Sequence, residues 1–213
     1  MIAHHKQRNN LLNINALLIF TLLTITVFYG CKKEIGEHLL GDLKKQNPYN
    51  GSETIVFIDS ANSDSIVFLG NGRGSYRIHT PSSASIERYY VNEMDTCCFI
   101  EQNNNYRFYI YLASRYDEDG LIDISFIDDN CKSHITSRRI PLFVTHPYID
   151  SLFVNDKYYY KVIVDSSLLR QNAGENNCNN GVLPYSIYYT TTHGIIKIDF
   201  EDGTSWELKE IIP

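Results

Sequence analysis

The sequence predicts an all-β fold, an antiparallel β-sandwich or a β-barrel-like single domain, on three observations. The chain is rich in aromatic side chains, with 16 Tyr and 10 Phe but only 2 Met among 213 residues. Aromatic and β-branched side chains suit the pleated, half-buried surface of a sheet. Short apolar runs also alternate with clusters of Asn, Asp, Ser and Gly, and the chain closes with a clear hairpin pattern. Such punctuation is typical of short strands joined by turns.

The first 30 residues have the pattern of a secretory signal. Residues 1–15 carry Lys6 and Arg8 with no acidic residue, and residues 16–28 form an apolar run interrupted only by threonines. A helix of this length, at about 1.5 Å per residue, is shorter than the roughly 30 Å hydrocarbon core of a bilayer. The segment 1–30 is therefore predicted to be a cleaved signal peptide, with an uncleaved membrane anchor as the alternative.

The end of this segment resembles the lipobox of bacterial lipoproteins. Gly30 and Cys31 follow the apolar run, and Lys32, Lys33 and Glu34 come directly after them. The resemblance implies that the precursor is cut before Cys31 and that this cysteine carries the lipid. Several acyl chains, at about 0.8 kcal/mol per buried CH₂, would then hold the protein on a membrane without a spanning helix.

The chain that remains after Cys31 is acidic. Residues 1–30 hold two of the 19 Lys and Arg and none of the 25 Asp and Glu, so residues 31–213 keep 17 positive and 25 negative side chains, a net charge of −8. That balance lacks the basic patch of a nucleic-acid-binding protein, so no nucleic-acid partner is expected. The length suits one domain with its own hydrophobic core.

Residues 31–50 are interpreted as a tether, and residues 51–213 as the β-rich domain. The tether is mostly polar, but Ile35, Leu39, Leu40 and Leu43 fall at helical spacing before Pro48. This spacing predicts a short amphipathic turn that ends before the proline. A helix that binds a partner is the alternative.

The first strands of the domain form a predicted hairpin. Thr54–Ile58 and Ser65–Leu69 flank a polar loop. The glycine-rich run Gly70–Gly74 follows, and we interpret it as a turn or bulge because glycine adopts positive φ freely. A phosphate-binding loop would need a helix after it, and Tyr76–Pro81 does not have a helical pattern.

Six further strands and a second hairpin complete the prediction. In the run Tyr106–Ser114, alternate residues form one core face and one aromatic, polar face. A brief helix is expected at Ser166–Arg170 and a polar loop at residues 172–181. The closing hairpin turns at Asp202-Gly203, and Trp206 is expected to fill the core. The strands predicted here are Ile86–Val91, Thr96–Glu101, Tyr106–Ser114, Leu121–Ile127, Leu142–Val144, Tyr158–Val164, Gly194–Phe200 and Ser205–Leu208.

Four cysteines remain once Cys31 is set aside: Cys97, Cys98, Cys131 and Cys178. In an oxidising compartment they could form two disulfides, in three connectivities. Neighbouring residues on a strand point to opposite faces, so Cys97 and Cys98 are not expected to pair with each other. We expect one bridge from this pair to Cys131 or Cys178, with free buried thiols as the alternative.

No catalytic, metal or cofactor site is predicted. The chain has no G-x-S-x-G and no H-E-x-x-H motif, and Cys131 with His134 lacks a second pair of zinc ligands. His79, His146 and His193 stand alone in the sequence, and the acidic run Asp117–Gly120 is interpreted as a turn rather than a calcium loop. Enzymatic activity stays undecided, and these patterns favour a protein that is not an enzyme.

Both ends of the chain resemble small lipoproteins of Bacteroidota bacteria. The residues that carry the resemblance are Asn47-Pro48-Tyr49, Tyr188-Tyr189, Gly194-Ile195-Ile196 and Ser205–Leu208. It implies a lipid-anchored protein of the outer membrane, on its periplasmic face or at the cell surface. The triplets that begin at Asp59, Asp64 and Asp150 also resemble an O-glycosylation motif of that phylum, which implies modification at Ser60, Ser65 and Ser151.

Taken together, these patterns favour a lipid-anchored cell-envelope protein whose β-rich domain has a binding or structural role. The expected partners are the membrane, through the N-terminal lipid, and an envelope protein or a glycan. A small envelope hydrolase acting on glycan or peptide is the alternative. A barrel that enclosed a cavity would instead favour a small ligand.

Overall fold

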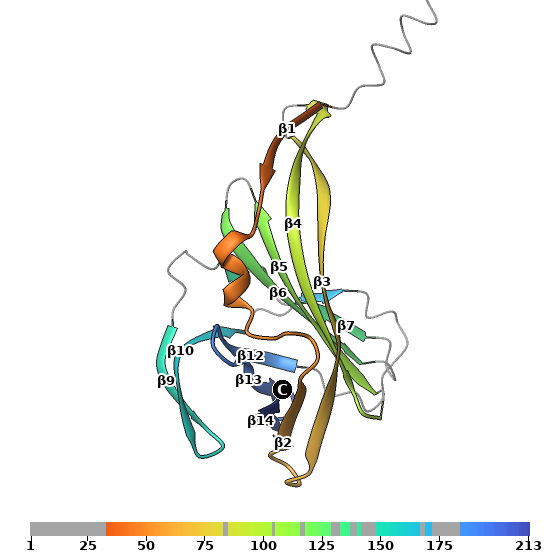
Figure 1. Ribbon diagram of the computed structural model, residues 1–213. Coiled ribbons are helices and arrows are strands. Elements are labelled where there is room, and N and C mark those ends of the chain that lie inside the picture. Colours follow the sequence, from red (N-terminus) through yellow and green to blue (C-terminus); the bar gives the residue numbers. More distant parts are fainter. Residues whose placement is uncertain are drawn as a thin grey trace, which may run out of the picture. The chain divides into compact units, whose positions relative to one another are not determined.

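The computed structural model confirms an all-β, antiparallel fold (Figure 1). It describes residues 33–82, 85–103, 105–115, 118–128, 133–136, 140–141, 148–166, 169–171 and 184–213. A single 3-10 helix, η1 (Gly41–Gln46), accompanies the strands in these ranges. The strands are β1 (Lys33–His38), β2 (Thr54–Asp59), β3 (Ser65–Ser82), β4 (Ser85–Glu101), β5 (Tyr106–Arg115), β6 (Glu118–Asp128), β7 (Ser133–Thr136), β8 (Ile140–Pro141), β9 (Tyr148–Val154), β10 (Lys157–Asp165), β11 (Leu169–Gln171), β12 (Pro184–Thr190), β13 (Gly194–Phe200) and β14 (Ser205–Ile212).

The strands follow one another as two meanders that join where β2 meets β14. The order across the sheet is β11-β7-β6-β5-β4-β3-β2-β14-β13-β12-β10-β9, with β1 beside β4 and β8 beside β6. Most neighbours along this order are also successive in the chain, as expected for short hairpin connections, and the exceptions are β7 with β11, β2 with β14 and β10 with β12. β2, which comes early in the chain, and β14, the last strand, lie side by side near the middle of this order, with Phe57 opposite Leu208.

The described chain divides into two compact units. One consists of residues 33–37 and 79–90, and the other of residues 38–78 and 91–213. In the smaller unit, β1 pairs with β4, and an added Cβ on Gly36 would lie 3.2 Å from the ring of Tyr90. The ring of His79 stacks on that of Tyr89 with centroids 4.6 Å apart. In this unit, strand pairing and one aromatic stack therefore connect its segments.

In the larger unit the sheet curls so that strands far apart in its order meet across a core. The ring of Trp206 on β14 lies 5.8 Å from that of Phe126 on β6 and 5.1 Å from that of Tyr106 on β5. Phe200 on β13 also contacts Phe126, at 6.4 Å. Trp206 therefore fills the core, as its isolated position in the closing hairpin predicts.

Both predicted hairpins are present. β2 pairs with β3, Thr54 opposite Leu69, and β13 pairs with β14, Ile198 opposite Trp206. Gly203 closes the second turn with φ of +85°. On β5 the side chains of Phe108, Ile110 and Leu112 are fully buried, while Tyr109 and Tyr111 stack on the other face.

Three expectations differ from the structure. The helix predicted at Ser166–Arg170 is wrong: β11 covers Leu169–Gln171 and pairs with β7, because pairing with a distant strand outweighs a weak local preference. The two strands predicted at Ile86–Val91 and Thr96–Glu101 are one strand, β4. Of the turn or bulge expected at Gly70–Gly74, the turn is absent, because the run lies within β3, where Gly72 has a φ of +104°.

The glycine run has a packing reason. The N–H of Gly72 donates to the carbonyl oxygen of Gly51 at 2.8 Å. A Cβ on Gly70 would lie 2.5 Å from that same oxygen, and a Cβ on Gly51 would lie 2.4 Å from the carbonyl carbon of Gly72. Glycine is required here because two backbones touch, not because the chain reverses direction.

Several predictions concern residues outside the described ranges. The signal segment, Cys31, the strand Leu142–Val144, and the loop 172–181 lie there, as do Cys131, His146 and Cys178. Within the described ranges, no helix has the length and apolar character needed to cross a membrane.

Candidate binding surface

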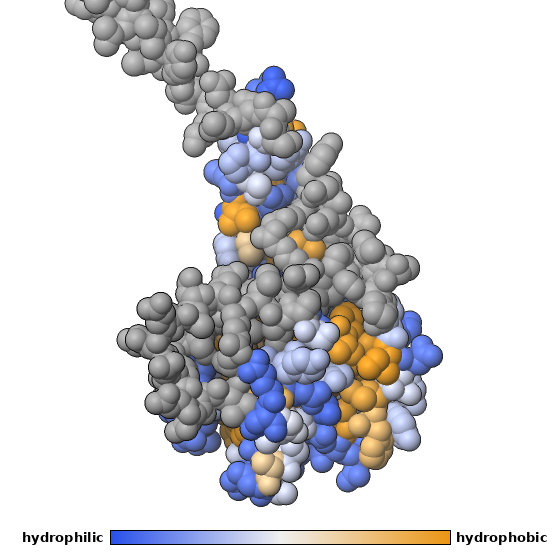
Figure 2. Space-filling view, turned by 180° about the vertical axis from the view of Figure 1, so that it is seen from behind, coloured by the Kyte–Doolittle hydropathy of each residue, from blue (hydrophilic) through white to orange (hydrophobic). Residues whose placement is uncertain are grey.

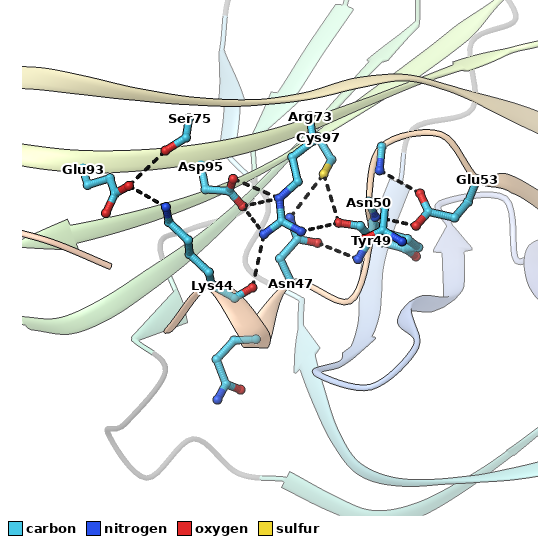
Figure 3. A network of polar contacts seen from close by, with 12 residues as sticks. Lys44, Asn47, Tyr49, Asn50, Glu53, Arg73, Ser75, Glu93, Asp95 and Cys97 are labelled. Atoms are coloured by element: carbon cyan, nitrogen blue, oxygen red, sulfur yellow. Dashed lines mark hydrogen bonds and ion pairs between the residues drawn. The ribbon is translucent and has the colours of Figure 1, made fainter. Parts of the chain in front are cut away.

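A buried polar network holds residues 40–53, here called the strap, within the larger unit (Figure 3). The predicted tether boundary at residue 50 is therefore displaced: Leu40 and Tyr49 are 2% and 1% exposed and belong to the hydrophobic core. The predicted turn before Pro48 is present as η1. Apolar side chains on both sides of η1 draw this part of the expected tether into the fold.

Arg73 on β3 is the centre of the network. Its Nε lies 3.0 Å from both carboxylate oxygens of Asp95 on β4, and its Nη2 lies 2.7 Å from Oδ2. The same guanidinium donates to the strap, from Nη1 to the carbonyl oxygen of Tyr49 at 2.6 Å and from Nη2 to that of Lys44 at 3.2 Å. The planar fork of arginine suits a bidentate partner and further acceptors at once. The hydrogen bonds that Arg73 donates to Asp95 raise the pKa of Arg73 further.

Glu93 binds the start of the strap. Its carboxylate accepts the N–H of Leu40 at 2.9 Å and pairs with Lys44 Nζ at 2.6 Å. Ser75 Oγ also donates to it, at 3.0 Å. These contacts, the hydrogen bond from Lys44 first and that from the Leu40 N–H next, lower the pKa of Glu93.

Tyr49 fastens the strap to the C-terminal meander. The N–H of Ile195 on β13 donates to Tyr49 Oη at 2.9 Å, and the ring of Tyr49 meets that of Phe99 at 4.9 Å. Tyr189 on β12 donates from its hydroxyl to the carbonyl oxygen of Gln46 at 2.8 Å. Burial raises the pKa of both tyrosine hydroxyls, so they stay neutral donors and acceptors.

Cys97 belongs to this network and is not a reactive thiol. Its Sγ accepts a hydrogen bond from Asn47 Nδ2 at 3.4 Å and lies 3.6 Å from the carbonyl oxygen of Tyr49. Burial raises its pKa to about 11, the opposite of what a nucleophile requires. Cys98 points to the other face and is partly exposed, and both are free thiols in the described structure. Bridges to Cys131 or Cys178 stay predictions.

The buried carboxylates of the network are thus engaged by an arginine and by backbone groups. Glu53 follows the same pattern, since its carboxylate accepts the N–H of Asn50 and, at 2.8 Å, that of Gly51. In the part of the chain that the structure describes, no group of three or more His, Cys, Asp or Glu side chains is placed to hold a metal ion. The contacts of this network fix the strap to the strands around it, so its role is structural.

A second feature, the hairpin of β9 and β10, presents aromatic side chains to solvent. Tyr158 lies opposite Phe153, and Tyr160 lies opposite Ser151. Directly opposed residues share one face of a pair of strands, so these four side chains project together. Phe153, Tyr158 and Tyr160 are 55%, 63% and 67% exposed. We call these four residues, Ser151, Phe153, Tyr158 and Tyr160, the aromatic face.

The opposite face of the hairpin is fixed in the core. Val154 and Tyr159 are buried, and Leu152 packs against the same cluster. The tip turns at Asn155 and Asp156, with φ of +44° and +63°. Two successive positive φ angles define a type I′ turn, which matches the twist of the strands.

Polar contacts hold the tip of the hairpin against β14. Asn155 Nδ2 donates to the carbonyl oxygen of Leu208 at 3.4 Å, and Lys157 Nζ donates to that of Lys209 at 3.3 Å. The ring of Tyr159 also meets that of His193 edge to face, with centroids 5.1 Å apart. The backbone that carries the exposed aromatic side chains is therefore fixed against β14 and His193.

Hydrophobic side chains gather on this flank of the molecule. Figure 2, turned by 180° from Figure 1, shows an orange area on the side that carries β9 and β10. Tyr148 and Ile149 on β9 are also exposed, as is Tyr185 on β12. Contiguous exposed apolar side chains of this kind are typical of interaction sites.

The sequence reasoning missed this surface. It predicted a strand at Tyr158–Val164 but not its partner β9 or the turn between them. The signal was the pair Asn155-Asp156 between two apolar runs, because Asn and Asp tolerate the positive φ that a I′ turn needs. Arg73, Asp95 and Tyr49 were missed as well, and no local motif marks them.

The residues expected to be O-glycosylated occupy different settings. Ser60 and Ser65 are exposed beside the β2–β3 loop, and Ser60 Oγ accepts the N–H of Ser205 at 2.8 Å. Ser151 is exposed at the centre of the aromatic face. Modification at these positions stays a prediction.

Comparison with protein-family models, with curated proteins and with solved structures gives no match at the threshold of significance applied.

Proposed function

We propose that this chain is a lipid-anchored protein of the cell envelope, held through Cys31, whose β-rich part binds another envelope component through the aromatic face. The observation that carries the binding role is the exposure of Phe153, Tyr158 and Tyr160 on a hairpin whose other side is buried. Tyrosine and phenylalanine are enriched in protein interfaces, where they contribute large contact area for little loss of side-chain entropy.

A protein partner fits the aromatic face better than a glycan does. The rings of Phe153 and Tyr158 pack against each other with centroids 4.9 Å apart and planes tilted by 54°. Such a pair presents ring edges and a hydrophobic ridge rather than one flat platform for a sugar ring. Ridges of this kind insert into pockets of a partner protein, where buried aromatic anchors contribute most of the binding energy.

The anchor supports this role by its position in the chain. The strap begins nine residues after Cys31, at Leu40, and is fastened by Arg73, Glu93 and Tyr49. A lipid on Cys31 would therefore lie only nine residues in the chain from a segment that is fastened in the larger unit. The anchor would then keep the whole chain, with its aromatic face, at the membrane and so raise its local concentration relative to envelope partners.

Site-specific photo-crosslinking in intact cells tests the binding role. A photoreactive phenylalanine analogue replaces Tyr160 in one variant and Tyr76 in a control, since Tyr76 is 43% exposed on β3 outside the aromatic face. We expect a discrete adduct at position 160 that disappears when Phe153 and Tyr158 are changed to Ala, and none at position 76. Equal labelling at both positions would contradict the proposal, and an adduct removed by glycan-degrading enzymes would assign a glycan instead.

A further inference from the structure

The free edge of β9 is an unusual feature of the sheet. β9 ends the strand order, and its second edge pairs with no strand in the described ranges. It is seven residues long, Tyr148–Val154, and contains no Pro, no Lys and a single charged residue, Asp150. Natural proteins normally protect exposed edges with charges, prolines or bulges, because a bare edge recruits another strand.

The hairpin geometry determines which backbone groups face this edge. Val154 and Lys157 flank the two-residue turn and are the pair that closes it. In an antiparallel ladder the residues that bond to one neighbour alternate with those that bond to the other. Residues 154 and 152 therefore direct their N–H and C=O groups to β10, and residues 153 and 151 direct theirs to the open edge. Lys161, with a φ of +53°, interrupts the ladder for one pair, which resumes in the same register with Val162 opposite Ile149, so residue 149 follows 153 and 151.

We infer that β9 pairs with β9 of a second copy of this chain, antiparallel and centred on Ser151. A two-fold axis through Ser151 places the outward groups of residue 151 opposite those of its copy. It also places residue 149 opposite residue 153 of the copy. Three pairs of residues then lie opposite each other across the interface: 151 with 151, 149 with 153, and 153 with 149. Each pair exchanges two backbone hydrogen bonds, so about six bonds pair every N–H and C=O group that faces the open edge.

The side chains are complementary in this register. Ile149 and Phe153, both exposed in a single copy, would lie side by side across the interface. Ser151, the smallest residue of the strand, would meet itself at the axis. Asp150 would face Leu152 of the copy rather than another Asp150, so like charges are not directly opposed. A two-fold interface must be self-complementary, and this strand satisfies that condition.

The pairing leaves the aromatic face accessible. Backbone edges meet in the plane of the sheet, whereas Tyr158 and Tyr160 project from its surface. Two aromatic faces would join into one surface with two-fold symmetry. The inference does not depend on the lipid at Cys31 or on the identity of an envelope partner.

Oligomeric state measured on the purified full chain in a detergent micelle tests the inference. Ser151→Pro removes the central N–H at the open edge, where proline is tolerated in a single copy. Ser151→Ala keeps that N–H and is the matched control. We expect native mass spectrometry to show dimers for the wild type and Ser151→Ala, and a dissociation constant at least tenfold weaker for Ser151→Pro.

Disulfide trapping is a second test of the same dimer, and it does not depend on the folding of Ser151→Pro. Residues opposite each other across the axis have Cα atoms about 5.5 Å apart, within reach of a disulfide. Ser151→Cys should therefore form a covalent dimer under mild oxidation, whereas Asp156→Cys at the turn should not exceed the wild type. Wild-type chains that stay monomeric at all soluble concentrations, dimers that persist in folded Ser151→Pro, or equal trapping at positions 151 and 156 would each overturn the inference.

Discussion

Arg73 contacts the Asp95 carboxylate through two nitrogens, Nε and Nη2. The same guanidinium donates hydrogen bonds to the carbonyl oxygens of Tyr49 and Lys44. One buried ion pair thus links β3, β4 and the strap. Asp95 is 2% exposed, so removal of its charge would leave the cation without its partner in a poorly solvated place.

Asp95→Asn is predicted to lower the free energy of unfolding by about 3 kcal/mol, the range seen when one member of a buried pair is removed. Arg73→Lys should also destabilise the fold, because an ammonium group cannot reproduce the fork. Chemical denaturation measures both. The control is Asp42→Asn, which removes an exposed pair with Lys45 and should leave the midpoint unchanged. Equal effects at positions 42 and 95 would show that the buried pair does not fasten the strap.

Gly194 and Gly203 offer a matched pair of substitutions. Both have positive φ, +73° and +85°, so alanine is strained at either. A Cβ on Gly194 would lie 2.1 Å from Tyr49 Oη, whereas nothing lies within 4 Å of one on Gly203. Gly203→Ala should cost about 1 kcal/mol from backbone strain alone. Gly194→Ala should cost about 1–3 kcal/mol more, because the strap must move. Similar thermal midpoints for the two variants would contradict the position of Tyr49.

The stability contributed by Glu93 is predicted to depend on pH. Because its pKa in the folded protein lies below the ordinary value of 4.5, its contribution is complete above that value and is lost as the pH falls through the folded pKa. The wild type should therefore be more stable than Glu93→Gln at neutral pH, and the difference should shrink below pH 4.5. Denaturant titrations of both proteins at a series of pH values measure this difference. A difference that stays constant into acid would show that the carboxylate charge is not what holds Lys44 and Leu40.

The two neighbouring cysteines should differ in reactivity. Cys97 is fully buried with a pKa of about 11, whereas Cys98 is partly exposed on the other face. Alkylation of the native protein at mildly basic pH, followed by peptide mass mapping, should modify Cys98 long before Cys97. Mapping without reductant also reports any bridge to Cys131 or Cys178. Rapid modification of Cys97 would contradict its place in the core.

Sequence patterns predicted the parts of the fold that local chemistry determines. The hairpins β2–β3 and β13–β14 were found because turn residues and alternating apolar residues lie within a few positions of each other. The strap was not found, because the contact between Tyr49 and Ile195 joins positions 146 residues apart. Arg73 and Asp95 likewise become partners only through the pairing of β3 with β4.

The exposure of the aromatic face could not be predicted from the sequence either. Alternation in Tyr158–Val164 predicts a strand, yet it cannot show which alternate residues face solvent when aromatic side chains lie on both. Tyr159 is buried and its neighbours Tyr158 and Tyr160 are exposed because the hairpin packs one side on the core. Burial is decided by tertiary packing, which a single strand pattern does not contain.

The attachment of lipid at Cys31 is the part of the proposal on which location in the envelope depends. Cells that express the full chain are grown with a clickable palmitate analogue, and the purified protein is examined by intact mass and N-terminal peptide mapping. The proposal predicts labelled protein that begins at Cys31, and Cys31→Ala protein that is unlabelled and released from the membrane. Wild-type protein that retains residues 1–30 and incorporates no label would contradict it.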